Sequence, residues 1–528
     1  MKKTATILFT LLLVGITIWL IASRGNGAPQ YIARSELPEA LLDAGREMRV
    51  VILPETISEI VYRNRNEAFP PIVAGAAEVL NSFLTPNLDP STDAEIVERI
   101  RRHSESDYPP PTTLTHEEIA YELDFMFLLL RYSYGAYGYF GGDEVFIPLK
   151  ESMLEQLAQM SDPLDVDSYF YDLLVPNLQS VIADNHVAIF TESFETIGSM
   201  GVRSQLYMNN DFILQKDETG YILEIDGEIY RVGGITLCDG LQIYGVLPTL
   251  SRDGELVWAF GHVLYGLAVD AVIAPVEISV TLECVITGNS HNMYLNLYPV
   301  ANANISHRDM YAITESNGIP ILRNRRLQQF DGDPPVQHFA DTGAALRDEP
   351  VLILDLRGHS GGGDGYAADW IYQLTGYSPN YGMMFTHMRL YTLTACEINP
   401  WITATLPPRW DVWDTPADLH RFISNENLVI VLTDNAIGSA GDSFVGFLRQ
   451  LENVLIVGTN TSGTLVTGNV AFAVLPMSRL QIALGNSLNI RTDFSQFEGV
   501  GFMPDLWVSP NDSLQRVLRM IDRYEVRP

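Results

Sequence analysis

The stretch LILDLRGHSGGGDGYAADW (Leu352–Trp370) decides the fold class, because two kinds of periodicity meet in it. Its first part belongs to the continuous apolar run Pro350–Arg357, which is typical of a strand buried on both faces. Beyond the glycines, apolar residues recur at helical spacing and predict a helix that begins near Asp364. These residues are Ala367, Trp370, Ile371 and Leu374. A strand, a glycine turn and a helix form one unit of an α/β layer.

The same unit repeats towards the C-terminus. Two further apolar runs, NLVIVLTD (Asn427–Asp434) and NVLIVGT (Asn453–Thr459), predict buried strands, and a helical pattern separates them. A last amphipathic helix carries Leu514, Val517, Leu518 and Ile521 on one face. We therefore expect an α/β core with right-handed crossovers over residues 306–528.

The glycine cluster of the opening stretch fits more than one functional pattern. Gly358–Gly362 matches the G-x-S-x-G elbow of serine hydrolases with Ser360 as nucleophile, and His387 and His420 lie downstream as partners. Gly363–Ala368 matches a looser dinucleotide pattern, but no acidic residue follows at the distance that a dinucleotide site needs. No lysine follows the glycines, which excludes a phosphate-binding P-loop.

A second loop, DNAIGSAGDS (Asp434–Ser443), also follows a predicted buried strand. It places Ser439 at the start of a helix, where free N–H groups and the helix dipole stabilise an oxyanion. A serine at this position is equally typical of an ordinary helix N-cap. Because ligands of α/β layers bind beyond the carboxyl ends of the strands, both loops are candidate functional sites.

Upstream of the core the periodicity changes twice. Residues 30–200 predict mostly helix, including a segment in which Thr115 and Glu118 form a capping box. Tyr108–Thr113 is a proline-rich linker within this region. Residues 201–305 alternate apolar and polar side chains between Asp-Gly and Gly-Gly turns, which predicts a β-rich unit.

Composition limits the classes of partner. A chain of 528 residues predicts two to four domains, and a net charge of −32 argues against nucleic acid and anionic lipid as main partners. The three cysteines, Cys238, Cys284 and Cys396, form no Cys-x-x-Cys pair, so neither a zinc site nor a disulfide framework is predicted. A single Cys238–Cys284 disulfide is kept as an alternative if the chain is exported. We predict no metal and no cofactor.

The first 29 residues predict export. Lys2 and Lys3 precede twenty uncharged residues, Thr4–Ser23, and Arg24 follows. Twenty helical residues span about 30 Å, the thickness of a bilayer core. We expect a single-pass membrane anchor with a cytoplasmic N-terminus; the alternative is a cleaved signal peptide and a secreted protein. No cysteine lies nearby to support a lipoprotein anchor.

Six blocks of the sequence, taken in order, resemble the C-terminal-processing and tricorn-like family of serine proteases, also called tail-specific proteases. Four lie in the core: LILDLRGHSGGG, VIVLTDNAIGSAGDSFVGFL, VLIVGTNTSG and FEGVGFMPDLWV. Two lie upstream: LTHEEIAYELDFMFLLL and VIADNHVAIF. The resemblance implies a core of crotonase-like strand–helix repeats, preceded by the helical region and the inserted β-rich unit.

The resemblance also implies a catalytic set. One branch of the family uses a lysine where this chain has Thr464, which cannot act as a base. The tricorn-like branch uses a histidine and a glutamate, which match His186 and Glu498 here. Ser439 is then the nucleophile, His186 its general base, and Glu498 part of a polar relay. Asn185 replaces the serine or glycine that relatives have beside the histidine, and we expect it to support the local hydrogen bonds.

For the oxyanion hole, the N–H of Ala440 follows the nucleophile directly, and the resemblance adds Gly361 or Gly362. His359 and Ser360 depart from the family's usual Asn-Gly. We predict an extracytoplasmic serine peptidase acting on peptide or protein substrates. The alternatives are a non-catalytic binding module for apolar ligands on the same scaffold, and an esterase that depends on Ser360.

Overall fold

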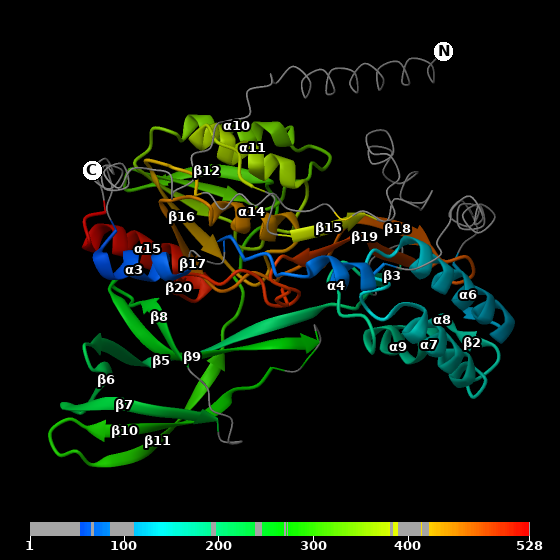
Figure 1. Ribbon diagram of the computed structural model, residues 1–528, viewed down its shortest axis with the longest axis horizontal. Helices are drawn as coiled ribbons and strands as arrows, with labels where there is room; N and C mark the ends of the chain where they lie inside the picture. The colour runs from blue at the N-terminus through cyan, green and yellow to red at the C-terminus, as the bar shows by residue number, and fades with distance from the viewer. Residues whose placement is uncertain are drawn as a thin grey trace.

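The structure is a computed structural model. It describes residues 53–64, 68–84, 110–191, 197–237, 245–268, 271, 273–380, 384–388, 413 and 422–526. Within these residues the chain forms three larger sheets of six, seven and five strands, with helices packed on the first and the last (Figure 1). The predicted N-terminal anchor, Cys238, Cys396 and His420 lie outside the described residues.

The six-stranded sheet forms the core, in the order β12-β13-β14-β16-β17-β20. Its strands are β12 (Tyr311–Ser316), β13 (Ile319–Asn324), β14 (Val351–Asp355), β16 (Leu428–Thr433), β17 (Val454–Gly458) and β20 (Leu506–Trp507). All pairs from β13 to β20 are parallel, and only β12–β13 is antiparallel. Every residue of β14, β16 and β17 is buried, which explains why these strands are apolar throughout.

Helices cover both faces of this sheet. On one face lie α10 (Val336–Ala345), α11 (Asp364–Thr375) and α14 (Ala440–Leu448), packed on Leu352 and Leu354. On the other lie α3 (Glu55–Asn64) and α15 (Pro510–Arg523), packed on Val351 and Ile353. Alternate residues of β14 therefore point to opposite layers. The predicted helix at Asp364 is confirmed, as is the strand–helix alternation.

The five-stranded sheet links the helical region to the core. Its order is β15-β19-β3-β4, with β18 also paired to β19. The strands are β15 (Met384–Met388), β19 (Gln481–Arg491), β3 (Ala188–Phe190), β4 (Ile197–Ser199) and β18 (Thr467–Val474). Because β3 pairs with β19, a segment near position 188 is fixed against one near position 482. This pairing brings the upstream VIADNHVAIF block to the C-terminal core.

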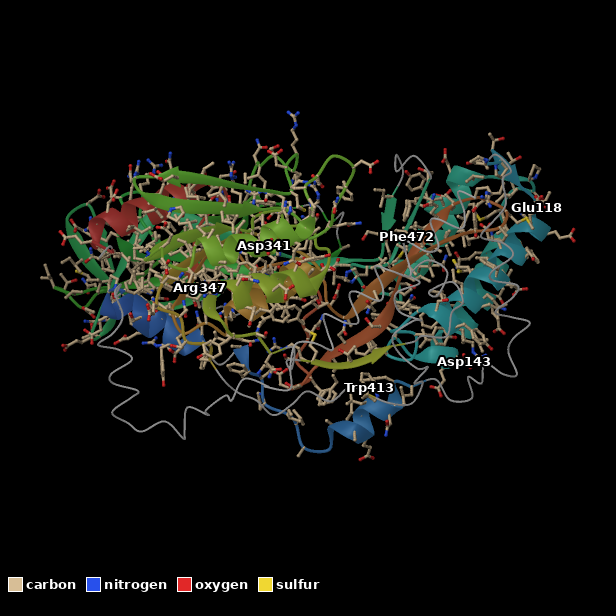
Figure 2. The ribbon with its side chains drawn as sticks, turned by 90° about the horizontal axis from the view of Figure 1, so that it is seen from above. Glu118, Asp143, Asp341, Arg347, Trp413 and Phe472 are labelled. Carbon is tan, nitrogen blue, oxygen red and sulfur yellow. The ribbon has the colours of Figure 1, made fainter. Side chains whose placement is uncertain are left out.

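The helical region packs on this sheet. It contains α4 (Ala76–Ser82), α6 (His116–Ser133), α7 (Gly142–Leu157), α8 (Val166–Ser168), the π-helix η3 (Tyr169–Leu174) and α9 (Val175–Gln179), with the short pair β1 (Thr113–Leu114) and β2 (Leu164–Asp165). The predicted capping box is confirmed, since the Thr115 side chain accepts from Glu118 N and the Glu118 carboxylate accepts from Thr115 N. Figure 2 shows Glu118 and Asp143 at this end of the molecule, far from Asp341 on α10.

The β-rich unit forms the seven-stranded sheet, in the order β11-β10-β7-β6-β5-β9-β8. The strands are β5 (Val202–Asp217), β6 (Gly220–Ile225), β7 (Glu228–Leu237), β8 (Val246–Leu250), β9 (Leu256–Ala268), β10 (Val276–Cys284) and β11 (Ser290–Pro299). Residues Asp226 and Gly227 join β6 to β7 with positive φ angles of 53° and 83°, as a tight hairpin turn requires. A further pairing of β11 with β5 closes five of the strands into a ring.

Two smaller findings concern the remaining sequence expectations. Among the described residues, no helix is long and apolar enough to cross a membrane. Cys284 is a buried free thiol.

Candidate active site

Ser439 lies in the loop between β16 and α14, directly before the first residue of the helix. Its φ and ψ are 56° and −124°, a conformation that non-glycine residues rarely adopt. Its side chain makes no capping hydrogen bond to the helix, which rules out the ordinary N-cap role for this serine. The loop is fixed on both sides: Gly438 N donates to His359 O at 3.0 Å, and Ser462 N donates to Ile437 O at 2.8 Å. A strained serine held in this way presents its hydroxyl away from its own helix.

His186 meets Ser439 although 253 residues separate them. The distance from His186 Nε2 to Ser439 Oγ is 3.0 Å. His186 precedes β3, and the pairing of β3 with β19 positions it. Burial lowers the pKa of His186, and the charge of Asp184 and the Thr467 backbone offset this only in part. The imidazole is therefore neutral at pH 7 and can accept the Ser439 proton.

Glu498 accepts hydrogen bonds from the backbone beside His186. One carboxylate oxygen accepts from Asn185 N at 2.7 Å, and the other accepts from Leu465 N and Val466 N at 3.0 and 2.8 Å. Glu498 thus joins the histidine segment to the chain just before β18. Burial, and then the charge of Asp184, raise the pKa of Glu498 well above its usual value.

Asp184 is a site residue that the sequence analysis did not single out. Its Oδ1 accepts from His186 N at 2.8 Å, and its Oδ2 accepts from Tyr134 OH at 2.7 Å. Thr467 Oγ1 donates to the same carboxylate. The available signal was the Asp-x-His spacing, because an aspartate two residues before a histidine can bond to its backbone N–H. His186 Nδ1 is buried and has no hydrogen-bond partner of good geometry among the described residues.

The three candidate oxyanion donors, Ala440, Gly361 and Gly362, differ in whether their backbone N–H already has a hydrogen-bond partner. Ala440 is the first residue of α14, so its N–H has no partner within the helix. Gly361 packs on the nucleophile, because a methyl group placed there would lie 2.9 Å from Ser439 Cβ. However, Gly361 N donates to His359 Nδ1 at 3.1 Å. Gly362 forms an isolated parallel bridge with Leu327, in which Gly361 O accepts from Leu327 N and Gly363 N donates to Leu327 O. The N–H of Gly362 itself therefore faces away from Leu327.

His359 is buried, whereas the neighbouring Ser360 is exposed. Burial lowers the pKa of His359 to about 3, so the ring is neutral, and its Nε2 has no partner among the described residues. Ser360 is exposed, and its hydroxyl donates to the Arg325 carbonyl at 3.4 Å rather than to a histidine. Among the described side chains, no histidine is hydrogen-bonded to Ser360; His420 and the side chain of His387, the two predicted partners, lie outside them.

Thr464 lies where relatives have a lysine, and Asp442 of α14 fixes the turn that carries it. The two Asp442 oxygens accept from Gly463 N and Thr464 N at 3.0 and 2.9 Å. Burial raises the pKa of Asp442 to about 7, although the hydrogen bonds that its carboxylate accepts lower the pKa in part. The acid of the Ser-Ala-Gly-Asp motif therefore joins the nucleophile helix to the neighbouring turn.

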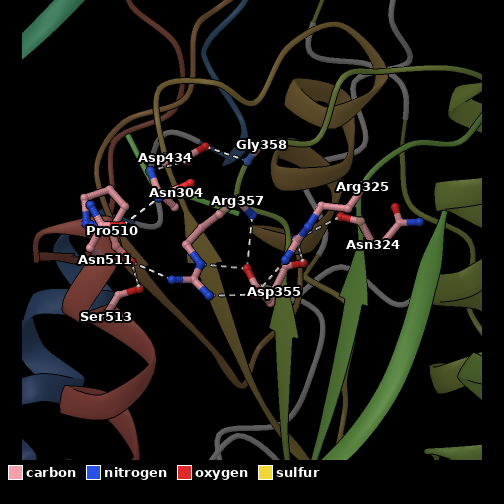
Figure 3. A network of polar contacts seen from close by, with 11 residues as sticks. Asn304, Asn324, Arg325, Asp355, Arg357, Gly358, Asp434, Pro510, Asn511 and Ser513 are labelled. Carbon is pink, nitrogen blue, oxygen red and sulfur yellow. Dashed lines mark hydrogen bonds and ion pairs between the residues drawn. The ribbon is translucent and has the colours of Figure 1, made fainter. Parts of the chain in front are cut away.

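A buried ionic network lies at the carboxyl end of β14, beside the start of the glycine loop at Gly358 (Figure 3). Asp355, at the end of β14, forms ion pairs with Arg325 and Arg357 at 2.9 and 2.7 Å. Burial alone would raise the pKa of Asp355, but the hydrogen bonds and charges of the two arginines lower it. Asp434, at the end of β16, accepts from Gly358 N at 2.8 Å and from Ala303 N at 3.2 Å. These contacts fix the glycine loop relative to the loop of Ser439.

A hydroxyl hydrogen-bonded to a neutral imidazole at a helix N-terminus is the arrangement that serine hydrolases use. Among the described residues, no group of His, Cys, Asp and Glu could hold a metal ion. Residues 326–508 match the model of peptidase family S41, and a peptidase function is implied for this part of the chain. This confirms the resemblance that the sequence motifs predicted. Ser439 and Glu498 lie inside the matched range, and His186 lies outside it.

Several solved structures are similar to the chain at low identity. Mature CPAF matches with 14% identity and a TM-score of 0.40, covering 77% of this chain and 98% of its own. The photosystem II D1 C-terminal processing protease matches with 14% identity and a TM-score of 0.33, and the match covers 77% of this chain and 98% of the protease. The tricorn protease matches with 15% identity and a TM-score of 0.33, and the match covers 78% of this chain and 37% of the tricorn chain. No curated protein sequence matches the chain.

Proposed function

We propose that the chain is a serine peptidase that hydrolyses peptide bonds through an acyl-enzyme on Ser439, with His186 as general base. The observation that supports this most directly is the 3.0 Å contact between Ser439 Oγ and His186 Nε2. Burial keeps His186 neutral, as a base must be before the reaction begins.

In the proposed first step, Ser439 Oγ attacks the carbonyl carbon of the scissile bond and His186 Nε2 takes the hydroxyl proton. The tetrahedral intermediate places a negative charge on the former carbonyl oxygen. Ala440 N–H and the Gly362 N–H are suited to donate to this oxygen, each contributing about 3 kcal/mol. Gly361 contributes here only if its N–H leaves His359 Nδ1.

In the second step the C–N bond breaks, and His186 returns the proton to the leaving amine. Water then attacks the acyl-enzyme with His186 again as base, which releases the acid and restores the Ser439 hydroxyl. We assign Glu498 and Asp184 to positioning, because they hold the backbone of Asn185 and His186 rather than the imidazole ring.

We also propose that the catalytic part acts outside the cytoplasm, tethered by the N-terminal segment or secreted if that segment is cleaved. Two lysines before the apolar run Thr4–Ser23 and the length of that run support this location.

Fluorophosphonate labelling tests the proposed chemistry. We expect wild type and Ser360→Ala to be labelled on the peptide that contains Ser439, and Ser439→Ala to lose both labelling and peptidase activity. Labelling that is lost in Ser360→Ala but kept in Ser439→Ala would select the esterase alternative instead. A folded wild-type protein that retains an apolar ligand and is not labelled would select the binding module.

A further inference from the structure

His359 is a fully buried histidine near the nucleophile, and the proposed reaction gives it no role. It lies in the glycine loop, Gly358–Gly363, and its backbone is bonded on both sides. His359 N donates to Leu356 O at 3.0 Å, and His359 O accepts from Gly438 N at 3.0 Å. Gly438 directly precedes Ser439 in the chain. The backbone of His359 therefore joins the glycine loop to the loop of the nucleophile.

The imidazole ring of His359 adds a contact to each of these loops. Its Nδ1 accepts from Gly361 N at 3.1 Å. The same Nδ1 faces the first turn of α14, because a methyl group placed on Gly441 would lie 2.6 Å from it. Gly361 in turn lies against the nucleophile, since a methyl group placed on it would lie 2.9 Å from Ser439 Cβ and 3.4 Å from Ser439 Oγ. The ring is therefore packed between the nucleophile helix and the backbone that adjoins the serine.

The glycine loop has few side chains that could limit its conformation. Gly361 and Gly362 have φ angles of +103° and +128°, a region that is open mainly to glycine. Two hydrogen bonds tie part of the loop to the segment after β13: Leu327 N donates to Gly361 O at 2.7 Å, and Gly363 N donates to Leu327 O at 2.9 Å. The peptide group that carries Gly361 N is instead held by His359 Nδ1. This side-chain contact therefore sets the direction of that peptide group.

The ring makes this contact although its other nitrogen is left without a partner. Burial lowers the pKa of His359 to about 3, so the ring is neutral. A neutral imidazole that accepts a hydrogen bond at Nδ1 carries its proton at Nε2. His359 Nε2 is buried and has no hydrogen-bond partner in the part of the chain that the structure describes. Because an unbonded buried donor destabilises a folded protein, packing alone does not account for a histidine at this position.

We propose that His359 is a positioning residue: its Nδ1 holds the Gly361 peptide group, and this keeps the glycine loop in the shape that presents the Gly362 N–H to the oxyanion. The inference rests on the proposed peptidase function and adds to it a residue that acts through the backbone. The required property is a free lone pair at Nδ1, and not the charge or the basicity of the ring. An acceptor at this place closes a small turn with the N–H two residues ahead.

Two substitutions separate the acceptor from the volume of the ring. His359→Asn keeps an acceptor, because asparagine Oδ1 and histidine Nδ1 are both bonded to Cγ. His359→Leu keeps a side chain that branches at Cγ and has no acceptor. In steady-state kinetics with one fluorogenic peptide at pH 7, we expect His359→Leu to lower kcat about a hundredfold and to leave KM within about threefold of wild type. His359→Asn should keep kcat within about threefold of wild type, because it closes the same turn.

Thr342→Val is the matched control for the loss of a buried acceptor in the same layer of helices. Thr342 Oγ1, on α10, accepts from Trp370 Nε1 of α11 at 3.1 Å, and both residues are buried. This variant should lose stability against urea as His359→Leu does, but its kcat should equal that of wild type. An equal fall of kcat in both variants would assign the effect to destabilisation and overturn the proposal.

A peptide aldehyde supplies a readout that a merely structural role would not change. Ser439 Oγ adds to the aldehyde carbon, the hydroxyl proton passes to His186, and the former carbonyl oxygen becomes the oxyanion. We expect His359→Leu to weaken inhibition by the aldehyde by about the factor by which it lowers kcat/KM. An uncleaved peptide should bind to Ser439→Ala with the same affinity whether or not His359→Leu is also present, as measured by fluorescence anisotropy. Equal losses in both measurements would mean that the substitution damages substrate binding, and would overturn the proposal.

NMR of the imidazole nitrogens separates this inference from the catalytic proposal. In protein with isotope-labelled histidines, the ring signals that are missing from His359→Asn belong to His359, and we expect them to show a neutral ring with its proton on Nε2. If wild type is not labelled by fluorophosphonate, the peptidase proposal fails, and this tautomer would still support the Nδ1 contact. If wild type is labelled but the proton lies on Nδ1, or if His359→Leu equals or exceeds wild type in kcat, the role of His359 is overturned.

Discussion

At the scale of single residues, the site combines a strained serine with a buried, neutral histidine. The positive φ of Ser439 turns its hydroxyl away from α14 and towards His186 Nε2. His186 is held through its backbone N–H by Asp184, and its ring contacts Ser439 Oγ through Nε2. The reactive contact therefore depends on two backbone geometries as much as on two side chains.

The pKa of His186 predicts where activity is lost in acid. Burial lowers this pKa below 6.5, and only the neutral imidazole can accept the Ser439 proton. The acid limb of the kcat/KM profile should therefore have its midpoint below pH 6.5, with full activity at pH 7. Steady-state kinetics across the acidic range checks this, with circular dichroism to exclude unfolding. A midpoint above pH 6.5 would contradict the neutral buried base.

His359 predicts a pH dependence of stability. Its pKa is about 3 when folded and 6.5 when unfolded, so the unfolded chain binds more protons between these values. The stability that the neutral ring provides is present above pH 6.5 and is lost as the pH falls through this window, by up to about 1.4 kcal/mol per pH unit. His359→Asn should remove this part of the acid sensitivity. Urea unfolding of both proteins at several pH values measures it, and identical slopes would show that His359 does not titrate in this way.

At the scale of elements, α14 and the glycine loop approach so closely that neither tolerates a Cβ at the contact. A methyl group on Gly441 would lie 2.6 Å from His359 Nδ1 and 2.8 Å from Ile437 Cγ2. His359 in turn accepts from Gly361 N and from Gly438 N. The first turn of α14, the nucleophile loop and the oxyanion loop are thus one packed unit.

Gly441→Ala should therefore reduce activity although alanine favours helices. Displacing His359 moves the oxyanion loop relative to Ser439, and a shift of about 1 Å costs on the order of a hundredfold in rate. The loss should fall on kcat more than on KM, because the oxyanion forms only during the reaction. Gly365→Ala in the first turn of α11 is the control, since its methyl group meets nothing within 4 Å. Equal activity of the two variants would contradict the packing argument.

At the scale of the whole molecule, the β-rich unit is attached to the core by the β8–β9 hairpin. Its turn rests on α15: Arg516 Nη1 donates to Leu250 O, and Tyr524 OH accepts from Leu256 N at 3.0 Å. Gly254 in this turn is so close to α15 that a methyl group placed on it would lie 2.2 Å from Met520 N. This attachment and the Asp434–Ala303 hydrogen bond join the β-rich unit and the segment after it to the core.

Gly254→Ala should weaken the attachment of the β-rich unit to α15. Gly254 has a φ of +78°, so alanine adds about 1–2 kcal/mol of backbone strain, and the clash with α15 backbone adds more. Gly288→Ala is the matched control, because Gly288 has a φ of +69° in the β10–β11 turn and open space around it. Thermal unfolding should show a larger loss for Gly254→Ala than for Gly288→Ala. A similar loss in both would mean that strain alone accounts for it.

Much of the core could be predicted from the sequence, because its signals are local. The apolar runs of β14, β16 and β17 mark strands buried on both faces, and the spacing after Gly363 marks α11. The β-hairpin at Asp226-Gly227 and the capping box at Thr115 follow from residue types that tolerate one backbone conformation or bond to their own chain. The resemblance to the protease family likewise rests on motifs within short segments.

The sequence by itself indicated which residues are equipped for the chemistry: a serine at a helix start, a histidine and a glutamate in family-like motifs, and a glycine loop. The tertiary structure brought a histidine to one of the two candidate serines, because the pairing of β3 with β19 places His186 Nε2 at 3.0 Å from Ser439 Oγ. It also decided that Glu498 acts through backbone N–H groups, that Asp184 belongs to the site, and that Gly361 N donates to His359. These outcomes depend on contacts between segments hundreds of residues apart, whose distances no local pattern encodes.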